Sequence, residues 1–259
     1  MIHLKTYQEI ELMRESAVLV SRTHAELAKV IRPGITSIYL DSLAEEFIRD
    51  NGGVPGFKGY NGFPNTLCVS QDHHVVHGIP NNHEIMEGSI LSVDCGVVMN
   101  GFYGDSAYTF SVGKISDEKQ RLLDVTKQAL DLGVSEAICG NTIGDIGYSI
   151  QKFAESHGYS VVKELVGHGI GKNLHEDPEV PNYGFKNKGK IIEHGMVLAI
   201  EPMINIGSAD IKQSDDGWTI ETKDGLSSAH FEYTIAVTKE KTEVLSQFNL
   251  IEDILKLTI

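Results

Sequence analysis

The stretch VDCGVVMNGFYGD, residues 93–105, predicts a β-hairpin with an aspartate on each strand. Its central residues are mostly apolar, as in a half-buried sheet, and the Asn-Gly pair at 100–101 is the dipeptide that a tight type I′ turn prefers. A two-residue turn there pairs Asp105 with Gly96, which lies two residues from Asp94. Because side chains alternate along a strand, we expect Asp94 and Asp105 on one face of the sheet, about 7 Å apart or less.

Two carboxylates this close raise an electrostatic question. Like charges at such a distance need a cation between them, a shared proton or solvent. Carboxylates are also depleted in strands and costly to bury unpaired. The hairpin alone leaves two interpretations open: a polar tip that faces water, or a pair of ligands for a cation.

The composition indicates a globular protein with an ordinary core. The 259 residues are 41% hydrophobic and 22% charged, as is typical of soluble domains. A net charge of −14 argues against a protein that coats nucleic acid or anionic membranes. The N-terminus lacks the continuous apolar segment of a signal peptide, no run is long enough to cross a membrane, and the three cysteines form no CxxC pair. We therefore expect a cytoplasmic protein without nucleic-acid or membrane partners.

Capping residues and periodicity divide the chain into helices and strands. Nothing resembles a linker, so we expect one compact α+β unit. The expected helices cover about 6–31, 37–50, 117–137 and 142–158. The expected strands include 66–70, the hairpin of 90–112, 161–167, 195–204, and a second hairpin of 218–222 and 231–237 around Lys223-Asp224-Gly225.

A short internal repeat links the first hairpin to the second half of the chain. EGSILSVD at 87–94 resembles HGMVLAIE at 194–201, and both end in a carboxylate. The residues after Asp105 likewise resemble those after Glu232. An acid at a strand end and an acid on a neighbouring strand thus occur once in each half, which predicts a duplicated sheet unit.

Four acids within apolar stretches and a histidine between glycines form a candidate metal site. The acids are Asp94, Asp105, Glu201 and Glu232, and the histidine is His168 of VGHGIG. A lone strand glutamate usually faces solvent, but two matching pairs favour a shared role. Four carboxylates with one imidazole suit two divalent ions rather than one structural zinc. The chain has no P-loop, GxSxG or GxGxxG motif that would offer a rival chemistry.

In its motifs the chain resembles the short, bacterial type I methionine aminopeptidases over essentially its whole length. The matching segments, in family order and spacing, are RPGITSIYLD, NTLCVSQDHHVVHGIP, ILSVDCGVVMNGFYGDSA, VGHGIGKNLHEDP, GMVLAIEPM and HFEYT. The chain begins directly at the catalytic region, without the zinc-binding extension or the inserted helical subdomain of other types. The resemblance implies an α+β, pita-bread fold with a curved, mainly antiparallel sheet covered by helices. It also implies a single catalytic domain, 1–259, with pseudo-symmetric halves of about 1–140 and 141–259.

The resemblance further implies a dinuclear metal site. Asp94 would chelate one divalent ion, and His168 and Glu201 would bind the other. Asp105 and Glu232 would bridge both ions. The metals would be cobalt, manganese, iron or zinc, which the sequence does not distinguish.

Further site residues are implied by the same motifs. His175 would hydrogen-bond the scissile carbonyl, His77 would lie beside the scissile amide, and Glu201 would be the general base. From composition alone, His77 would be a strand-end or surface histidine, as we expect for His73 and His74. The methionine pocket would be formed by Tyr60, Phe63, Cys68, Leu174 and Trp218. Composition alone would assign these five residues to the core. Leu174 is a departure, since many relatives have an aromatic residue at this position.

The implied activity is removal of N-terminal methionine from nascent proteins and peptides, with preference for a small second residue. A metal-bridging hydroxide would attack the first peptide bond. The partners would be methionyl peptides, nascent chains and the ribosome near its exit tunnel. The basic loop KNKGK at 186–190 is the feature that could contact the ribosome, although such a loop is usually just solvated. The chain would be a monomer.

Two other functions compete with this one. An X-prolyl aminopeptidase or dipeptidase would have the same fold but a large extra N-terminal domain. A catalytically dead pita-bread module that binds peptides or proteins would have lost metal ligands, whereas all five are present here.

Overall fold

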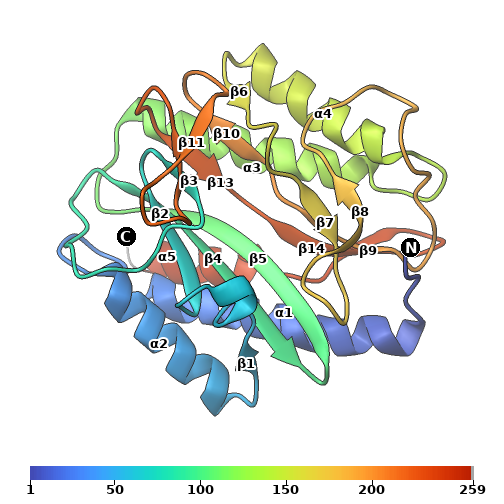
Figure 1. Ribbon diagram of the computed structural model, residues 1–259, viewed down its shortest axis with the longest axis horizontal. Helices are drawn as coiled ribbons and strands as arrows, with labels where there is room; N and C mark the ends of the chain where they lie inside the picture. The colour runs from blue at the N-terminus through green and yellow to red at the C-terminus, as the bar shows by residue number, and fades with distance from the viewer. Residues whose placement is uncertain (258–259) are drawn as a thin grey trace.

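Antiparallel strands run through the middle of the molecule, with helices packed against them (Figure 1). The computed structural model describes residues 1–257. The helices are α1 (Tyr7–Ala28), α2 (Ser37–Asp50), α3 (Asp117–Glu136), α4 (Ile143–Ser156) and α5 (Phe248–Leu257). The strands are β1 (Val54–Pro55), β2 (Leu67–Gln71), β3 (His74–Val76), β4 (Ile90–Met99), β5 (Phe102–Ser111), β6 (Ser160–Val161), β7 (Gly167–Gly169), β8 (Glu176–Val180), β9 (Val197–Ile200), β10 (Met203–Asn205), β11 (Ile211–Gln213), β12 (Ile220–Thr222), β13 (Ser228–His230), β14 (Tyr233–Val237) and β15 (Thr242–Val244). This is the expected α+β class.

The long helices begin at the capping residues that the sequence predicts. The side chains of Thr6, Thr36 and Ser116 each accept a hydrogen bond from the backbone N–H three residues later. Such caps satisfy N–H groups that have no partner within the helix. The one clear difference is at the end of α1, which stops at Ala28 rather than near residue 31.

The β4–β5 hairpin has the predicted turn and register. Gly96 pairs with Asp105, and Asn100 and Gly101 both have positive φ, 54° and 77°, as a type I′ turn requires. Asp94 therefore shares a face with Asp105. It lies in the middle of β4, however, and not at a strand end.

Three expectations about the later strands are wrong. The expected strand 161–167 does not form, because β6 ends at Val161 and β7 begins at Gly167. The expected strand 195–204 is interrupted at Glu201-Pro202, and its two parts, β9 and β10, belong to different sheets. A proline has no N–H to donate to a ladder, so the pairing of β9 ends there. The expected second hairpin does not form either, because β12 pairs with β11 and β3, whereas β14 pairs with β9 and β15. Asp224 accepts hydrogen bonds from the N–H groups of Ser208 and Leu226, which directs the chain from one sheet to another.

Side-chain hydroxyls join β5 to β14. This junction, where the sheets of the two halves meet, is called the β5–β14 seam. Thr234 Oγ1 donates to the carbonyl of Asp105 at 2.6 Å and accepts from its N–H at 3.2 Å. Ser106 Oγ donates to the carbonyl of Glu232 at 2.7 Å, and the Glu232 N–H donates to Ala107. These bonds fix the backbone of Asp105 relative to that of Glu232.

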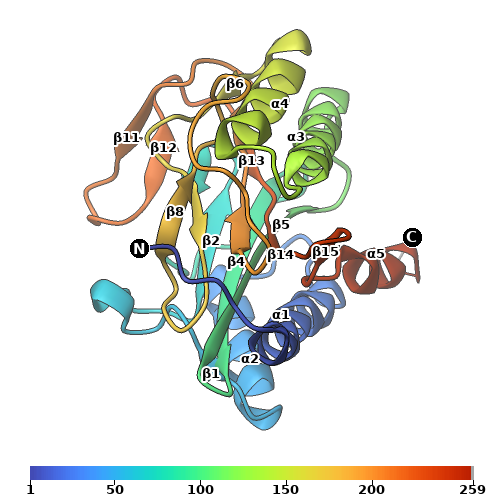
Figure 2. The ribbon, with the colours of Figure 1, turned by 90° about the vertical axis from the view of Figure 1, so that its right-hand side faces the viewer.

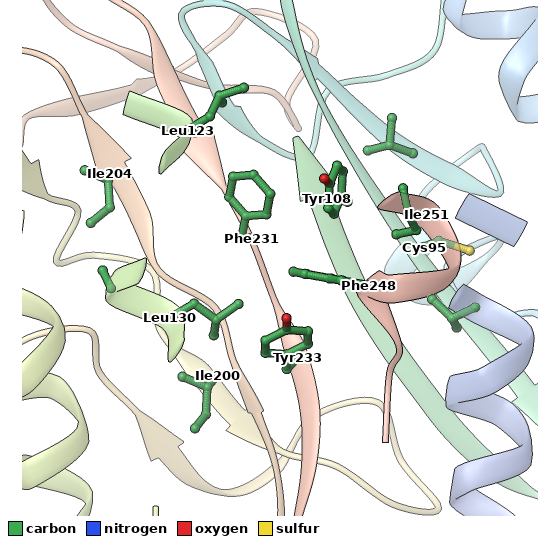
Figure 3. Packing of buried hydrophobic residues seen from close by; sticks show 14 of the residues in the cluster. Cys95, Tyr108, Leu123, Leu130, Ile200, Ile204, Phe231, Tyr233, Phe248 and Ile251 are labelled. Atoms are coloured by element: carbon green, nitrogen blue, oxygen red, sulfur yellow. The ribbon is translucent and has the colours of Figure 1, made fainter. Parts of the chain in front are cut away.

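Aromatic packing covers the opposite face of this seam. Phe248 of α5 lies against Tyr108 and Tyr233, with ring centroids 4.9 and 4.1 Å apart (Figure 3). Since side chains alternate along a strand, Asp105 and Glu232 face away from this cluster. Figure 2 shows α1, α3 and α5 on one side of the strands and β11 and β12 at the opposite edge. The acids therefore lie on the face of these strands opposite to the one that α5 covers.

Within residues 1–257, no helix combines the length and the apolar character needed to cross a membrane.

Candidate active site

Acids from two strand pairs meet beside the β5–β14 seam. The β4–β5 hairpin carries Asp94 and Asp105. The last pair between β9 and β14 is Ile200 with Tyr233. Glu201 and Glu232 are the next residues beyond this pair, so they lie opposite each other just past the end of the two strands. All four line one cavity, so both halves of the chain contribute to a single site.

His168 joins the acids from β7, and its glycine neighbours explain how. A Cβ on Gly167 would lie 2.3 Å from the carbonyl oxygen of Ala199, and one on Gly169 would lie 2.2 Å from that of Asp177. Only glycine permits this approach of β7 to its neighbours. The glycines on either side of His168 thus allow close backbone packing.

The ring of His168 presents an unprotonated nitrogen to the acids. Its Nδ1 lies 2.9 Å from the carbonyl oxygen of Gly169, an acceptor, so Nδ1 carries the hydrogen and Nε2 is left with its lone pair. Nε2 lies 3.5 Å from Glu201 Oε1 and 4.0 Å from Asp105 Oδ2. Burial lowers the pKa of His168 to about 4. This neutral, oriented imidazole is the form that binds a metal ion.

Burial and mutual repulsion hold protons on the acids of this site. Burial, with Glu201 nearby, raises the pKa of Asp94 to about 7, and burial raises that of Glu201 to about 8. Burial and the neighbouring acids raise the pKa values of Asp105 and Glu232 well above their ordinary range. Without a cation, the site thus resists full ionisation.

Unpartnered oxygens support occupation by divalent ions. Asp94 Oδ1, Asp105 Oδ1 and Glu232 Oε1 are buried and have no hydrogen-bond partner within the described residues. Ligand atoms of Asp105, His168 and Glu232 all lie within 4.8 Å of one another. Unpaired buried carboxylates are costly, whereas a hard divalent ion binds oxygen donors of this kind. The residues therefore fit the metal-dependent chemistry that the sequence motifs imply.

The cavity beside the acids has an apolar wall. It measures about 180 Å³ and is lined by every candidate site residue of the sequence analysis, together with Phe57 and Asn61. Phe63 and Trp218 meet edge to face, with centroids 5.1 Å apart. Cys68 and Leu174 are buried next to Phe63 in the same hydrophobic cluster. This wall suits an unbranched apolar side chain.

Two histidines that are not among the predicted ligands also line the cavity. His77 has a φ of 60°, an uncommon conformation for a non-glycine residue, and burial lowers its pKa to about 4. His175 Nδ1 lies 2.8 Å from the hydroxyl of Tyr60, and its ring packs against His168 at 4.3 Å. His77 directly follows the end of β3, so the strand-end position that composition alone suggests is confirmed, whereas the alternative of a surface position is wrong because His77 lines the cavity.

One buried histidine near the acids was missed by the sequence reasoning. His230 Nε2 lies 3.4 Å from Glu201 Oε2, and the residue is almost fully buried on β13. Its place two residues before Glu232, on the same face of an extended segment, was the available signal.

A larger hollow of about 600 Å³ lies between α1, α3 and the aromatic face of β5. Its described lining includes a single carboxylate, Asp124, and no histidine or cysteine. The acids and histidines that could bind a metal therefore line the smaller cavity and not this hollow.

Comparisons with known proteins show the family to which the chain belongs. The model of metallopeptidase family M24 matches residues 11–239. A methionine aminopeptidase of Clostridium acetobutylicum is 48% identical over 247 residues, which cover 95% of this chain and 99% of that protein.

Solved structures extend the comparison to the fold. The crystal structure of methionine aminopeptidase from Rickettsia prowazekii matches with a TM-score of 0.94 at 38% identity, covering 95% of this chain and all of that one. Prolidase from Pyrococcus furiosus matches with a TM-score of 0.78 at 20% identity, covering 94% of this chain but 65% of that one, and shares the fold alone. The expected pita-bread fold is confirmed by these likenesses.

Proposed function

The chain belongs to metallopeptidase family M24, and on that premise we infer that it is a metal-dependent methionyl aminopeptidase, which removes N-terminal methionine from peptides. One observation carries the inference. Four acids, of which Asp105 and Glu232 are buried, and an unprotonated imidazole nitrogen open onto an apolar cavity with room for one methionine side chain.

The metal-holding residues are proposed to be Asp94, Asp105, His168, Glu201 and Glu232, around two divalent ions of manganese, iron, cobalt or zinc. When bound, such ions lower the pKa of water and polarise a carbonyl oxygen. The unpartnered oxygens and the position of Asp105 and Glu232 on either side of the seam support this assignment.

Glu201 is proposed as the residue that takes a proton from the attacking water and returns it to the leaving amine. Its carboxylate lines the cavity, with Oε1 3.5 Å from His168 Nε2. Bound cations would keep this carboxylate ionised and so able to accept the proton. His77 lines the same cavity and is proposed to lie beside the scissile amide.

His175 is proposed to donate a hydrogen bond to the oxyanion that forms at the scissile carbonyl. If the Tyr60 hydroxyl donates to Nδ1, to which it lies 2.8 Å distant, Nε2 must carry the hydrogen. Tyr60 thereby selects the tautomer that can donate into the cavity. Burial lowers the pKa of His175, which keeps this ring neutral.

Replacement of His175 with alanine is expected to lower kcat by about 10²- to 10³-fold, as for loss of one oxyanion donor, and to change KM little. Tyr60→Phe should give a smaller loss in kcat, because the ring stays but its tautomer is no longer selected. Steady-state kinetics on a methionyl tripeptide measures both. An effect of His175→Ala confined to KM would contradict the oxyanion role.

The apolar wall of Tyr60, Phe63, Cys68, Leu174 and Trp218 is proposed to hold the methionine side chain. The preference for a small second residue is proposed from the resemblance.

The setting of the enzyme is proposed from the resemblance. Residues 1–259 would form a single catalytic domain of two halves, each of which supplies one acid-bearing strand pair. The enzyme would act as a cytoplasmic monomer on nascent chains, near the exit tunnel of the ribosome.

Three peptides separate this function from that of a proline-specific relative. Met-Ala-Ser should lose methionine, Met-Leu-Ser should react more slowly, and Ala-Pro-Ala should remain intact. A chelator should abolish the first reaction, and added manganese or cobalt should restore it. Cleavage of Ala-Pro-Ala in preference to Met-Ala-Ser, measured by mass spectrometry, would overturn the proposal.

A further inference from the structure

A second group of metal-ligating side chains lies outside the cavity, at the edge formed by β3 and β12. His73, His74 and Glu221 each offer a ligand atom, and these atoms all lie within 4.8 Å of one another. All three residues are half-buried. The edge lies near the β11–β12 hairpin, at the side of the sheet away from α5 (Figure 2).

Backbone geometry explains why two consecutive histidines converge. Consecutive strand residues face opposite sides, but Asp72 has a φ of 51°, so His73 belongs to a turn and His74 begins β3. The two rings stack edge to face, with centroids 4.6 Å apart. The carboxylate of Asp72 fixes this turn by accepting from Lys119 Nζ at 2.7 Å and from the Ile90 N–H at 3.1 Å.

The pairing of β12 with β3 brings the third ligand. Glu221 lies opposite His74 across the two strands, with Glu221 Oε1 4.0 Å from His74 Nε2. The N–H of Thr222 donates to the carbonyl of His73 at 2.9 Å. The donors therefore come from β12, from β3 and from the turn before β3, whose backbones are already hydrogen-bonded, so little chain entropy is left to lose on binding.

We propose that His73, His74 and Glu221 form an additional metal site, separate from the catalytic acids, which binds zinc or copper. Two imidazoles and a carboxylate are donors that these ions prefer, in contrast to the oxygen-rich catalytic set. Three protein ligands leave a coordination position open to water or to another small ligand.

Neighbouring groups orient the ligands. Ser214 Oγ donates to Glu221 Oε1, and Lys212 Nζ lies 3.1 Å from Glu221 Oε2. Such partners hold a carboxylate in a binding orientation. Burial lowers the pKa of His74, which favours the neutral imidazole that a metal requires.

The site shares no residue with the catalytic cavity, but it is connected to the loop of Trp218. The N–H of Ser214 donates to the carbonyl of Thr219, and Asp216 Oδ1 accepts from the N–H groups of Trp218 and Thr219. A metal on Glu221 would therefore restrain the turn that carries Trp218. Trp218, the only tryptophan, would report binding through its fluorescence.

The test measures bound zinc after equilibrium dialysis at micromolar free zinc, so it does not depend on activity or on the number of catalytic ions. The double variant His73→Gln/His74→Gln should bind one equivalent less than the natural chain. Its matched control, His3→Gln/His194→Gln, removes two exposed imidazoles and should bind the same amount as the natural chain. Ser214→Ala should weaken the zinc affinity of this site about tenfold.

Copper gives an independent readout. The electron paramagnetic resonance spectrum of the copper-loaded natural chain should contain a signal with two coupled imidazole nitrogens, which the double variant lacks and the control keeps. Circular dichroism checks that both variants are folded, and Glu221→Gln serves as the alternative ligand variant if the double variant is not. Equal zinc content in the natural chain and the folded ligand variant, with unchanged copper spectra, would overturn the proposal. A natural chain that binds zinc and copper at this edge but does not remove methionine would instead count against the proposed function alone.

Discussion

Replacement of Glu201 with glutamine is expected to lower kcat on a methionyl peptide by about 10²- to 10⁴-fold, the usual contribution of a general acid–base residue. Glutamine keeps the size and one carbonyl oxygen of the side chain but can no longer accept a proton from water. Glu201 lines the cavity within 3.5 Å of His168 and 3.4 Å of His230. No change in packing is needed to explain a loss at this position.

The fold of Glu201→Gln should remain intact, and its metal-free form should not be less stable than that of the natural chain. The substitution removes a buried acid whose ionisation burial opposes. Glu179→Gln, at an exposed position of β8, is the matched control and should leave kcat unchanged. Metal content must be measured beside kcat, because a variant that had merely lost its metal would regain activity at higher metal concentration. Near-normal turnover by a metal-loaded Glu201→Gln variant would contradict the assignment.

Removal of metal is expected to make the stability of the folded chain fall steeply as pH rises from about 6.5 to 8.5. A carboxyl with a raised pKa in the folded state binds more protons there than in the unfolded chain, so stability is lost as pH rises towards the folded pKa. The folded pKa values of Asp94 and Glu201 are about 7 and 8, against 3.8 and 4.5 in ordinary surroundings. Those of Asp105 and Glu232 are raised further.

Buried histidines offset part of the loss of stability at lower pH, between about 4.5 and 6.5. Burial lowers the pKa of His168 and His77 to about 4, from 6.5, and a lowered histidine pKa makes stability fall as pH drops below about 6.5. Above that pH the histidines are neutral in both states and only the acids contribute. Several kcal/mol should be lost across the window, a shift in Tm on the order of 10 °C.

Thermal unfolding in the presence of a chelator and in excess manganese measures this effect. With metal bound, the acids stay ionised in the folded chain, and the fall with pH should disappear. Asp94→Asn should make the Tm of the metal-free protein fall less steeply with pH. Asp253→Asn, on the exposed side of α5, should leave this dependence unchanged. A metal-free Tm that rises with pH between about 6.5 and 8.5 would show that the acids are not held protonated.

Local patterns explain why the first hairpin was predictable from sequence. Asn100-Gly101 specifies the turn, and strand alternation then requires Asp94 and Asp105 to share a face. The match between 87–94 and 194–201 extended this reasoning to Glu201. Roles within the site came from the resemblance, since no local pattern distinguishes a bridging carboxylate from a chelating one.

The later strands were less predictable because their partners are set by tertiary contacts. β10, β12 and β13 each have three residues, too few for alternation to indicate which sheet they join. His230 and the approach of His73 to Glu221 depend on those pairings and were missed with them. Helix α5 differs, since Phe248, Ile251 and Leu255 repeat at helical spacing, and its amphipathic pattern could have been recognised.

Crystallography with anomalous scattering from manganese tests the central claim most directly. The manganese-loaded enzyme should show two strong peaks in the catalytic cavity, about 3.5–4 Å apart, with carboxylate oxygens of both Asp105 and Glu232 near each peak. A manganese-loaded enzyme that removes methionine but has no peak beside these two acids would contradict the account.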